Sequence, residues 1–127
     1  DTGVIWIANP NNPTGTRIGD SALRAFVESV PATVIVVIDE AYFEYVSEEG
    51  YPDASRWLKD FPNLIVTRTF SKVHGLAALR VGYGISDPDI ADLLNRLRQP
   101  FNVNAMAQTA ALAALQDQAF ILTASLK

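Results

Sequence analysis

At 127 residues, with 49% hydrophobic and 19% charged side chains, the chain has the composition of one globular domain rather than of a disordered segment. A net charge of −4 without any block of like charges argues against nucleic acid or an anionic membrane surface as the main partner. The chain has no cysteine, which excludes disulfides, and its single histidine disfavours a metal site. It also has no apolar run of about 18 residues, so we expect a cytoplasmic protein without a membrane span.

The first part of the chain alternates predicted strands and helices. A strand, expected to be buried, covers residues 4–8 and leads into a loop over 9–15 that contains two prolines and a glycine. A helix with an apolar stripe is predicted over about 20–30, and a continuously apolar, mostly β-branched strand over 33–38. Such a strand is typical of a parallel sheet that helices cover on both faces.

Two carboxylates end this second strand. Asp39 and Glu40 follow it directly, at the place where ligands bind in open α/β sheets. Because adjacent residues on a strand point to opposite faces, the two do not form the paired site of a hydrolase.

The second half of the chain continues the pattern. After a surface loop and a short helix over 54–59, a third strand is predicted over 64–67 and a fourth over 81–85. The connection between these strands is short for a parallel helical crossover, so we expect the fourth strand to be antiparallel. A helix is predicted to start within 86–89 and to end at Gln99-Pro100, and another to run from Asn102 or Asn104 to about Leu115; one more begins near Asp117. The fold class is therefore α/β, a three-layer α/β/α sandwich with a mostly parallel sheet. Three large aromatic side chains are expected in its core: Trp6, Trp57 and Phe101.

The stretch from Thr67 to Arg80 gathers side chains that suit a phosphorylated ligand. Thr69, Ser71 and Lys72 come just past the third strand, and Arg80 precedes the fourth. A lysine, two hydroxyls and an arginine within one connection suggest that an anion binds there.

Three ordered segments carry a resemblance to a known family: Asn-Pro-Asn-Asn-Pro-Thr-Gly at 9–15, Asp-Glu-Ala-Tyr at 39–42, and Thr-Phe-Ser-Lys with Gly-Leu-Ala-Ala-Leu-Arg within 69–80. They resemble the fold type I pyridoxal-phosphate aminotransferases, most closely the histidinol-phosphate aminotransferases. The segment 98–104 resembles the same family, so the similarity runs through essentially the whole chain. It implies pyridoxal 5'-phosphate as cofactor, and it implies that residues 1–127 are part of the large cofactor-binding domain.

The resemblance also implies roles for four residues around the cofactor ring. Lys72 matches the lysine that forms the Schiff base with the cofactor aldehyde and later shuttles a proton, and Asp39 matches the carboxylate that keeps the pyridine nitrogen protonated. These two are the candidate catalytic residues. Tyr42 and Asn12 match the residues that hydrogen-bond the ring oxygen. The plainer alternatives are a surface lysine, a turn aspartate, a core tyrosine and a turn asparagine.

The same resemblance makes Thr69, Ser71 and Arg80 the anchors of the cofactor phosphate, where a guanidinium can hold two oxygens at once. A strand threonine and a surface ion pair remain the alternatives for Thr69 and Arg80. Asn11 is interpreted as a turn residue. His74 has no evident carboxylate partner, and we expect it to have a packing or surface role.

The implied activity is transfer of an amino group between L-histidinol phosphate, or a related amino acid, and 2-oxoglutarate, in a homodimeric parent enzyme. Because the family's flanking segments for cofactor stacking and substrate binding have no match here, we expect the chain to be an incomplete fragment with weak or no activity alone. One alternative is a pyridoxal-phosphate decarboxylase of the threonine-phosphate type, and another is a non-catalytic scaffold. Nucleotide binding is the least favoured alternative, because Gly82-Tyr-Gly84 lacks the third glycine of a dinucleotide fingerprint.

Overall fold

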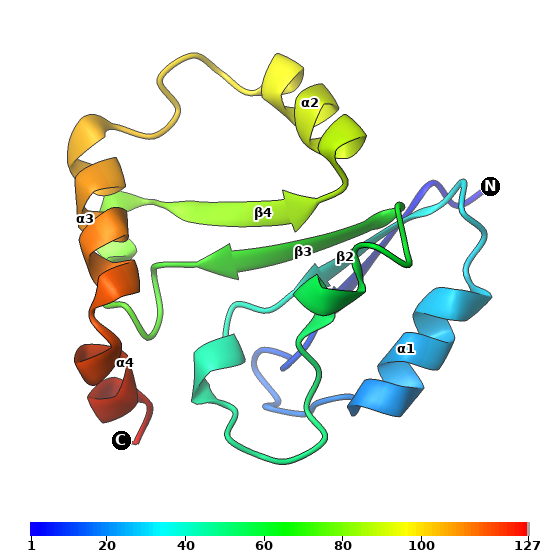
Figure 1. Cartoon of the computed structure of the whole chain (residues 1–127), viewed down its shortest axis with the longest axis horizontal. Coiled ribbons are helices and arrows are strands. Elements are labelled where there is room, and N and C mark those ends of the chain that lie inside the picture. The colour runs from blue at the N-terminus through cyan, green and yellow to red at the C-terminus, as the bar shows by residue number, and fades with distance from the viewer. Residues whose placement is uncertain (127) are drawn as a thin grey trace.

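The computed structural model describes residues 1–126 and has a four-stranded sheet at its centre (Figure 1). The strands lie side by side in chain order: β1 (Val4–Ala8), β2 (Ile35–Asp39), β3 (Leu64–Thr69) and β4 (Gly82–Ser86). The first three strands are parallel, and β4 pairs antiparallel with β3. The predicted α/β class, the mostly parallel sheet and the antiparallel fourth strand are confirmed.

Four helices and three short 3-10 helices surround or extend this sheet: α1 (Asp20–Ser29), α2 (Pro88–Leu97), α3 (Ala105–Gln116), α4 (Gln118–Ser125), η1 (Phe43–Tyr45), η2 (Ala54–Trp57) and η3 (Ala77–Leu79). Side-chain caps start the last three α-helices. Asp87, Asn104 and Asp117 each accept a hydrogen bond from a backbone N–H in the first turn that follows. The segment predicted as a short helix over 54–59 is a single 3-10 turn.

The main core lies between one face of the sheet and α1 with η2. Leu23 and Val27 of α1 pack on the sheet, and none of the side chains in this core is more than 6% exposed. Each fully buried aliphatic side chain contributes about 1.5–3 kcal/mol through removal from water. The remaining members of the core come from β2, β3 and η2: Val36, Ile38, Leu64, Val66, Ala54 and Trp57.

A second, smaller core joins α3 to the end of β3 and the start of β4. Ala107 and Ala111 pack against Phe70 and Val81, at the left of Figure 1. Alanines on the buried side of α3 allow the helix to approach the strands closely. Leu76 and Leu79, in the connection from β3 to β4 that carries the predicted lysine site, pack against this core.

The other face of β1 is uncovered in the described residues. Val4 is 49% exposed and Trp6 69% exposed, so the prediction of a buried first strand is wrong for this face. Phe101, also expected in the core, is 95% exposed, whereas Trp57 is buried as predicted. An apolar strand sequence predicts an apolar face of the sheet, but it does not predict which segment of the chain covers that face.

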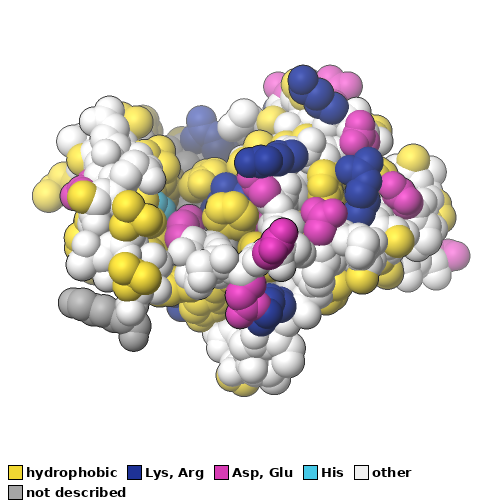
Figure 2. Space-filling view, turned by 60° about the horizontal axis from the view of Figure 1, so that its bottom comes forward, with side chains coloured by type: hydrophobic (Ala, Val, Ile, Leu, Met, Phe, Trp, Pro, Cys, Tyr) yellow, Lys and Arg dark blue, Asp and Glu magenta, His cyan; other side chains and the backbone are white. Residues whose placement is uncertain are grey.

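Apolar side chains also gather on α3 and α4. Figure 2 shows them as yellow atoms on the left of the molecule. The large exposed members are Met106, Leu112, Leu115, Phe120 and Leu122. None of the helices within residues 1–126 is long and apolar enough to cross a membrane.

Candidate functional site

The ends of β2 and β3 present two pairs of side chains to opposite faces of the sheet. Asp39 is the register partner of Thr67, and the residues that follow them, Glu40 and Arg68, form an ion pair. Because side chains alternate along a strand, the Asp39–Thr67 pair and the Glu40–Arg68 pair point to different sides. The two adjacent carboxylates therefore have separate environments and separate partners.

Asp39 is held by a hydroxyl and not by a cation. Thr67 Oγ1 donates to Asp39 Oδ1 over 3.1 Å, and both residues are half-buried. The other oxygen, Oδ2, receives no hydrogen bond from residues 1–126. This geometry leaves a carboxylate oxygen at the end of the sheet for a donor on a ligand.

Lys72 and Tyr42 meet across two different connections. Lys72 is exposed in the loop after β3, and its Nζ lies 5.0 Å from the centre of the Tyr42 ring. Tyr42 immediately precedes η1, after β2. The distance falls within the range of a cation–π interaction, so the ring orients the amine without a carboxylate partner.

Thr69, Ser71 and Arg80 form a connected group beside this lysine. The Ser71 backbone N–H donates to Thr69 Oγ1 over 3.0 Å, and Arg80 Nη1 donates to Ser71 Oγ over 3.3 Å and to the Ala77 carbonyl over 2.8 Å. Thr69 is the last residue of β3, which runs two residues further than predicted. The group combines two hydroxyls and an exposed guanidinium, which is chemistry that suits a phosphate.

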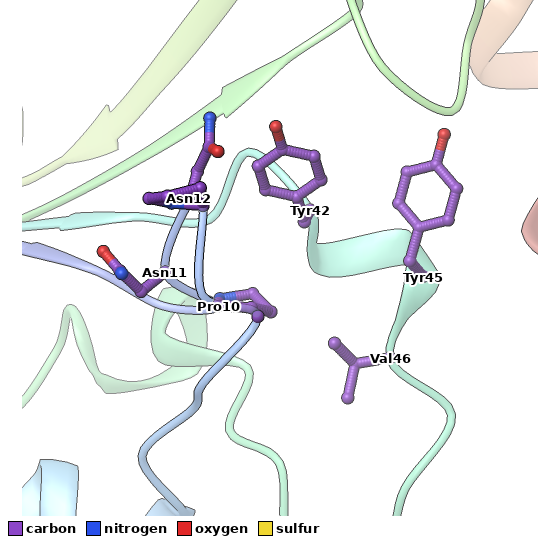
Figure 3. Close-up of a pocket in the computed structure, with 8 residues that line it drawn as sticks. Pro10, Asn11, Asn12, Tyr42, Tyr45 and Val46 are labelled. Carbon is purple, nitrogen blue, oxygen red and sulfur yellow. The ribbon is translucent and has the colours of Figure 1, made fainter.

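Asn12 and Tyr42 lie on the two sides of a pocket of about 350 Å³ (Figure 3). Pro10, Tyr45 and Val46 add an apolar wall, and Asn11 lies on the same loop as Asn12. Asn11 donates to Thr14 Oγ1 over 2.8 Å, in agreement with the turn role expected of it.

Asn9, which sequence reasoning did not single out, anchors the loop that carries Asn12. It is 1% exposed; its side chain donates to the Ile18 carbonyl and accepts from the Ile18 N–H over 3.1 and 2.8 Å. The Tyr51 hydroxyl donates to the Asn9 carbonyl over 2.6 Å. Burial raises the pKa of Tyr51, and the nearby Glu40 carboxylate adds to this, so the hydroxyl stays a donor. The sequence signal was present, since this is the first asparagine after an apolar strand.

A buried ion network fixes the segment between β2 and η2. Arg68 donates from Nε and Nη2 to Glu40 Oε2 over 2.9 and 2.7 Å, and from Nη2 to Asp53 Oδ1 over 2.7 Å. Its guanidinium carbon lies 3.7 Å from the centre of the Phe43 ring. Glu40, only 1% exposed, also accepts from the Ala54 N–H. One arginine thus joins β3 to both ends of the segment that carries Tyr42.

The two carboxylates of this network respond differently to their surroundings. Burial raises the pKa of Glu40, and the hydrogen bonds and charge of Arg68 offset this only in part. Burial also acts to raise the pKa of Asp53, but hydrogen bonds from Ser55 and the charge of Arg68 outweigh it and hold that pKa below its usual value.

His74 is a core residue rather than part of the site. It is 6% exposed, and its ring centre lies 4.8 Å from that of Phe70, with the two ring planes tilted by 43°. Its Nε2 lies 3.6 Å from Glu44 Oε1, so a carboxylate does lie nearby, contrary to the sequence-based expectation. The packing role proposed for His74 agrees with this burial.

Three adjacent strand ends therefore bring together most of the predicted site residues. Asn12 and Tyr42 share a pocket and Tyr42 contacts Lys72. The hydroxyls of Thr69 and Ser71 come just before Lys72 in the chain, and the Arg80 guanidinium comes after it. Asp39 lies at the end of β2, just before the segment that carries Tyr42. The arrangement combines an exposed amine, an open carboxylate oxygen and an anion-binding group, and it could hold a phosphorylated aldehyde with a basic ring nitrogen.

Comparisons with known proteins agree with this chemistry. The family model for aminotransferase class I and II matches residues 1–127. The chain is 59% identical over 116 residues to histidinol-phosphate aminotransferase 1 of Nitrosococcus oceani, covering 91% of this chain and 31% of that protein.

Solved structures of related enzymes also match this chain. The histidinol-phosphate aminotransferase of Sinorhizobium meliloti, in complex with pyridoxal-5'-phosphate, matches with a TM-score of 0.91 and 38% identity, covering 98% of this chain and 33% of that one. The L-threonine-O-3-phosphate decarboxylase of Porphyromonas gingivalis matches with a TM-score of 0.80 and 25% identity, covering 94% of this chain and 36% of that one. The chain spans about one third of the length of each of these relatives.

Proposed function

This chain belongs to the aminotransferase class I and II family, and from that premise we propose the activity of the complete polypeptide that carries it. We infer that it is a pyridoxal-phosphate-dependent aminotransferase, which moves an amino group between L-histidinol phosphate, or a related amino acid, and 2-oxoglutarate. The family and the fold class predicted from the sequence are confirmed by the comparisons. Histidinol phosphate is proposed from the name of the relatives at 56–60% identity, and 2-oxoglutarate from the family resemblance.

One observation supports this proposal most directly: the Lys72 amine lies 5.0 Å from the Tyr42 ring centre, next to the Thr69–Ser71–Arg80 group. An aldehyde cofactor with a phosphate requires an amine and an anion anchor at a fixed separation. The loop from Ser71 to Arg80, which folds back on itself through hydrogen bonds, provides both.

The described residues fit pyridoxal 5'-phosphate. When bound, this cofactor withdraws electrons from the substrate's Cα and so makes its proton acidic. Asp39 would hold a protonated ring nitrogen through Oδ2, which has no other hydrogen-bond donor within residues 1–126. Asn12 and Tyr42, on either side of the pocket, can each donate to an oxygen on the ring.

Lys72 has two tasks in this proposal. Its amine would hold the cofactor covalently, and when that amine is free it would be the base that takes the proton from the substrate's Cα. The Tyr42 ring favours a nearby cation, so it holds the protonated amine close to where that proton was taken.

The phosphate would be held by hydroxyls and a guanidinium. Ser71 and Thr69 each carry a hydroxyl, and Arg80 is exposed at the surface of the loop, with a guanidinium that can grip two oxygens. With the phosphate held at one end of the cofactor and the ring nitrogen held by Asp39 at the other, the ring would have little freedom to turn. This restriction keeps the amine of Lys72 at the reacting carbon.

The test uses the complete polypeptide and two variants. The wild type should develop a visible absorption band with pyridoxal phosphate, and the Lys72→Ala variant should not, whereas Lys59→Ala, a control at an exposed lysine beyond η2, should behave as the wild type. A Lys72→Ala protein that keeps the band would overturn the assignment of the lysine.

A second measurement separates the proposed activity from the decarboxylase alternative, which the similarity to the threonine-phosphate decarboxylase supports. The purified enzyme is given L-histidinol phosphate or L-threonine phosphate, each with 2-oxoglutarate. Glutamate formation with the first compound supports the aminotransferase, and release of carbon dioxide from the second supports the decarboxylase.

We further propose that the complete polypeptide is a cytoplasmic homodimer and that residues 1–127 are part of its cofactor-binding domain. The apolar side chains exposed on α3 and α4 (Figure 2) are a surface that a second subunit, or another part of the polypeptide, can cover. Sedimentation velocity on the complete polypeptide measures the mass directly, and a monomer at micromolar concentration would contradict the dimer.

A further inference from the structure

We propose that Thr67 is a positioning residue for the cofactor: its hydroxyl fixes the Asp39 carboxylate by holding Oδ1, so that Oδ2 is the oxygen that meets the ring nitrogen. This inference rests on the proposed function and deepens it. Thr67 lies outside the set of residues predicted from the sequence, and it acts through Asp39 rather than on the cofactor itself.

The backbone holds the two residues next to each other. Asp39 and Thr67 are register partners in the parallel pair β2–β3. The Asn9 N–H donates to the Asp39 carbonyl over 3.0 Å, and the Glu40 N–H donates to the Thr67 carbonyl over 2.9 Å. The backbone hydrogen bonds between the strands therefore continue to the strand ends, so Asp39 and Thr67 both belong to the sheet rather than to a free loop.

The side chain of Thr67 has little freedom to point elsewhere. Threonine is β-branched, which restricts its first side-chain torsion in a strand. Its partner on β4 is Gly84, which has no side chain to compete for the hydroxyl. The single hydroxyl proton is given to Asp39 Oδ1 over 3.1 Å, and this bond selects one orientation of the carboxylate.

A neutral donor suits this task better than a cation does. The carboxylate must keep its negative charge to hold a proton on the ring nitrogen. A cation at Thr67 would share that charge, and Arg68, the next residue, does this on the other face of the sheet, where it pairs with Glu40. The alternation of β3 thus gives Asp39 a hydroxyl and gives the buried Glu40 the guanidinium.

The experiment compares variants of the complete polypeptide loaded with pyridoxal phosphate labelled with ¹⁵N in the ring. The variants are Thr67→Val, which keeps the shape and loses the hydroxyl, Thr67→Ser, which keeps the hydroxyl, and Asp39→Asn. Thr109→Val serves as control: it removes an exposed hydroxyl on α3 whose single hydrogen bond within residues 1–126 goes to the Ala105 carbonyl. The ¹⁵N chemical shift over pH reports protonation of the ring nitrogen, and spin-column dilution reports the rate of cofactor release.

We expect Thr67→Val to make the ring nitrogen about tenfold more acidic and to release the cofactor about tenfold faster, the typical effect of one hydrogen bond to a charged group. Thr67→Ser should restore most of both properties, Thr109→Val should match the wild type, and Asp39→Asn should show the largest change. Should Thr67→Val not fold, Thr67→Ala is measured in its place.

The outcomes are distinguishable. If Asp39→Asn leaves the nitrogen signal unchanged, the ring-nitrogen role in the proposed function is wrong. If Asp39→Asn changes the signal and Thr67→Val does not, only the role of Thr67 is wrong. Equal loss in Thr67→Val and Thr67→Ser would mean that the side chain matters for packing, which also overturns the inference.

Discussion

The Lys72 amine faces the ring of Tyr42, with Nζ 5.0 Å from the ring centre. The two residues come from connections that follow different strands, β2 and β3. An aromatic face stabilises a nearby cation by about 0.5–1 kcal/mol when the site is exposed. Tyr42 therefore has two separable properties, a ring face toward Lys72 and a hydroxyl that can donate to the cofactor.

Two substitutions of Tyr42 separate these properties. Tyr42→Phe keeps the ring face and removes the hydroxyl, and we expect cofactor binding to persist while the visible band of the bound cofactor changes its dependence on pH. Tyr42→Leu removes both, and its turnover should be slower than that of Tyr42→Phe by about twofold to fivefold. Absorption spectra over pH, with steady-state turnover, measure both. Identical behaviour of the two variants would mean that the ring face has no part in the reaction.

The guanidinium of Arg80 should be needed for its shape as well as for its charge. Arg80→Lys keeps the charge but loses the fork that can hold two phosphate oxygens, and we expect cofactor affinity to fall about tenfold to a hundredfold. Equilibrium dialysis with pyridoxal phosphate measures the dissociation constant. The matched control is Arg96→Lys on α2, where an exposed arginine pairs with Asp92 one turn away. Equal affinities in both variants would remove Arg80 from the phosphate site.

Two arginines contact the same carboxylate of Asp53 and should contribute very differently to stability. Arg68 bridges Asp53 and the buried Glu40, whereas Arg56 bonds to Asp53 from an 82% exposed position. Arg68→Met leaves Glu40 buried without a counter-charge, and we expect a loss of about 3 kcal/mol or more in the free energy of unfolding. Arg56→Met should change it by less than about 0.5 kcal/mol.

Urea unfolding of the complete polypeptide measures both variants. In Arg68→Met, the Glu40 carboxylate stays buried without a counter-charge. The double variant Arg68→Met with Glu40→Gln also removes that charge, so it should recover part of the lost stability. If Arg68→Met were as stable as Arg56→Met, the network would not be what holds the segment from β2 to η2.

The loss of folding stability at acid pH should depend on Asp53. Burial acts to raise its pKa, but the Ser55 hydrogen bond and the charge of Arg68 outweigh this and lower it from the ordinary value of 3.8. A carboxyl with a lowered pKa in the folded state stabilises that state above its unfolded pKa, and this stabilisation is lost as the pH falls through the folded pKa. We therefore expect the difference in stability between wild type and Asp53→Asn to be full near neutral pH and to shrink below about pH 4.

Thermal unfolding at a series of pH values from neutral to acid gives this difference. Asp60→Asn is a suitable control, because Asp60 is more exposed and pairs with Arg24 at the surface. A constant difference between wild type and Asp53→Asn at every pH would mean that Asp53 stabilises the fold through shape rather than through its charge.

Much of the architecture was predictable because it depends on local patterns. The apolar run that ends at Asp39 predicts both a central strand and a carboxylate at the sheet end, and the short connection from β3 to β4 predicts the antiparallel pair. The caps at Asn104 and Asp117 also follow from residue type. These features need no knowledge of distant neighbours.

The remaining features depend on which strands lie together and in which register. The sequence does not tell that Thr67 lies beside Asp39, that Arg68 reaches Asp53, or that His74 lies near Glu44, because each pair is formed by segments that meet only in the folded chain. The exposure of Trp6 has the same origin, since an apolar strand face can only be assigned to the core once the covering segment is known.

The two tryptophans occupy opposite extremes of exposure, and this gives the protein two native optical reporters. Trp57 is 6% exposed, within the core between α1 and the sheet, whereas Trp6 is 69% exposed on the open face of β1. Indole emission shifts to shorter wavelength when water is removed from around the ring. In a Trp57→Phe background, the emission colour of Trp6 therefore reads out whether anything shields the open face of β1, while in a Trp6→Phe background Trp57 reports only the opening of the core.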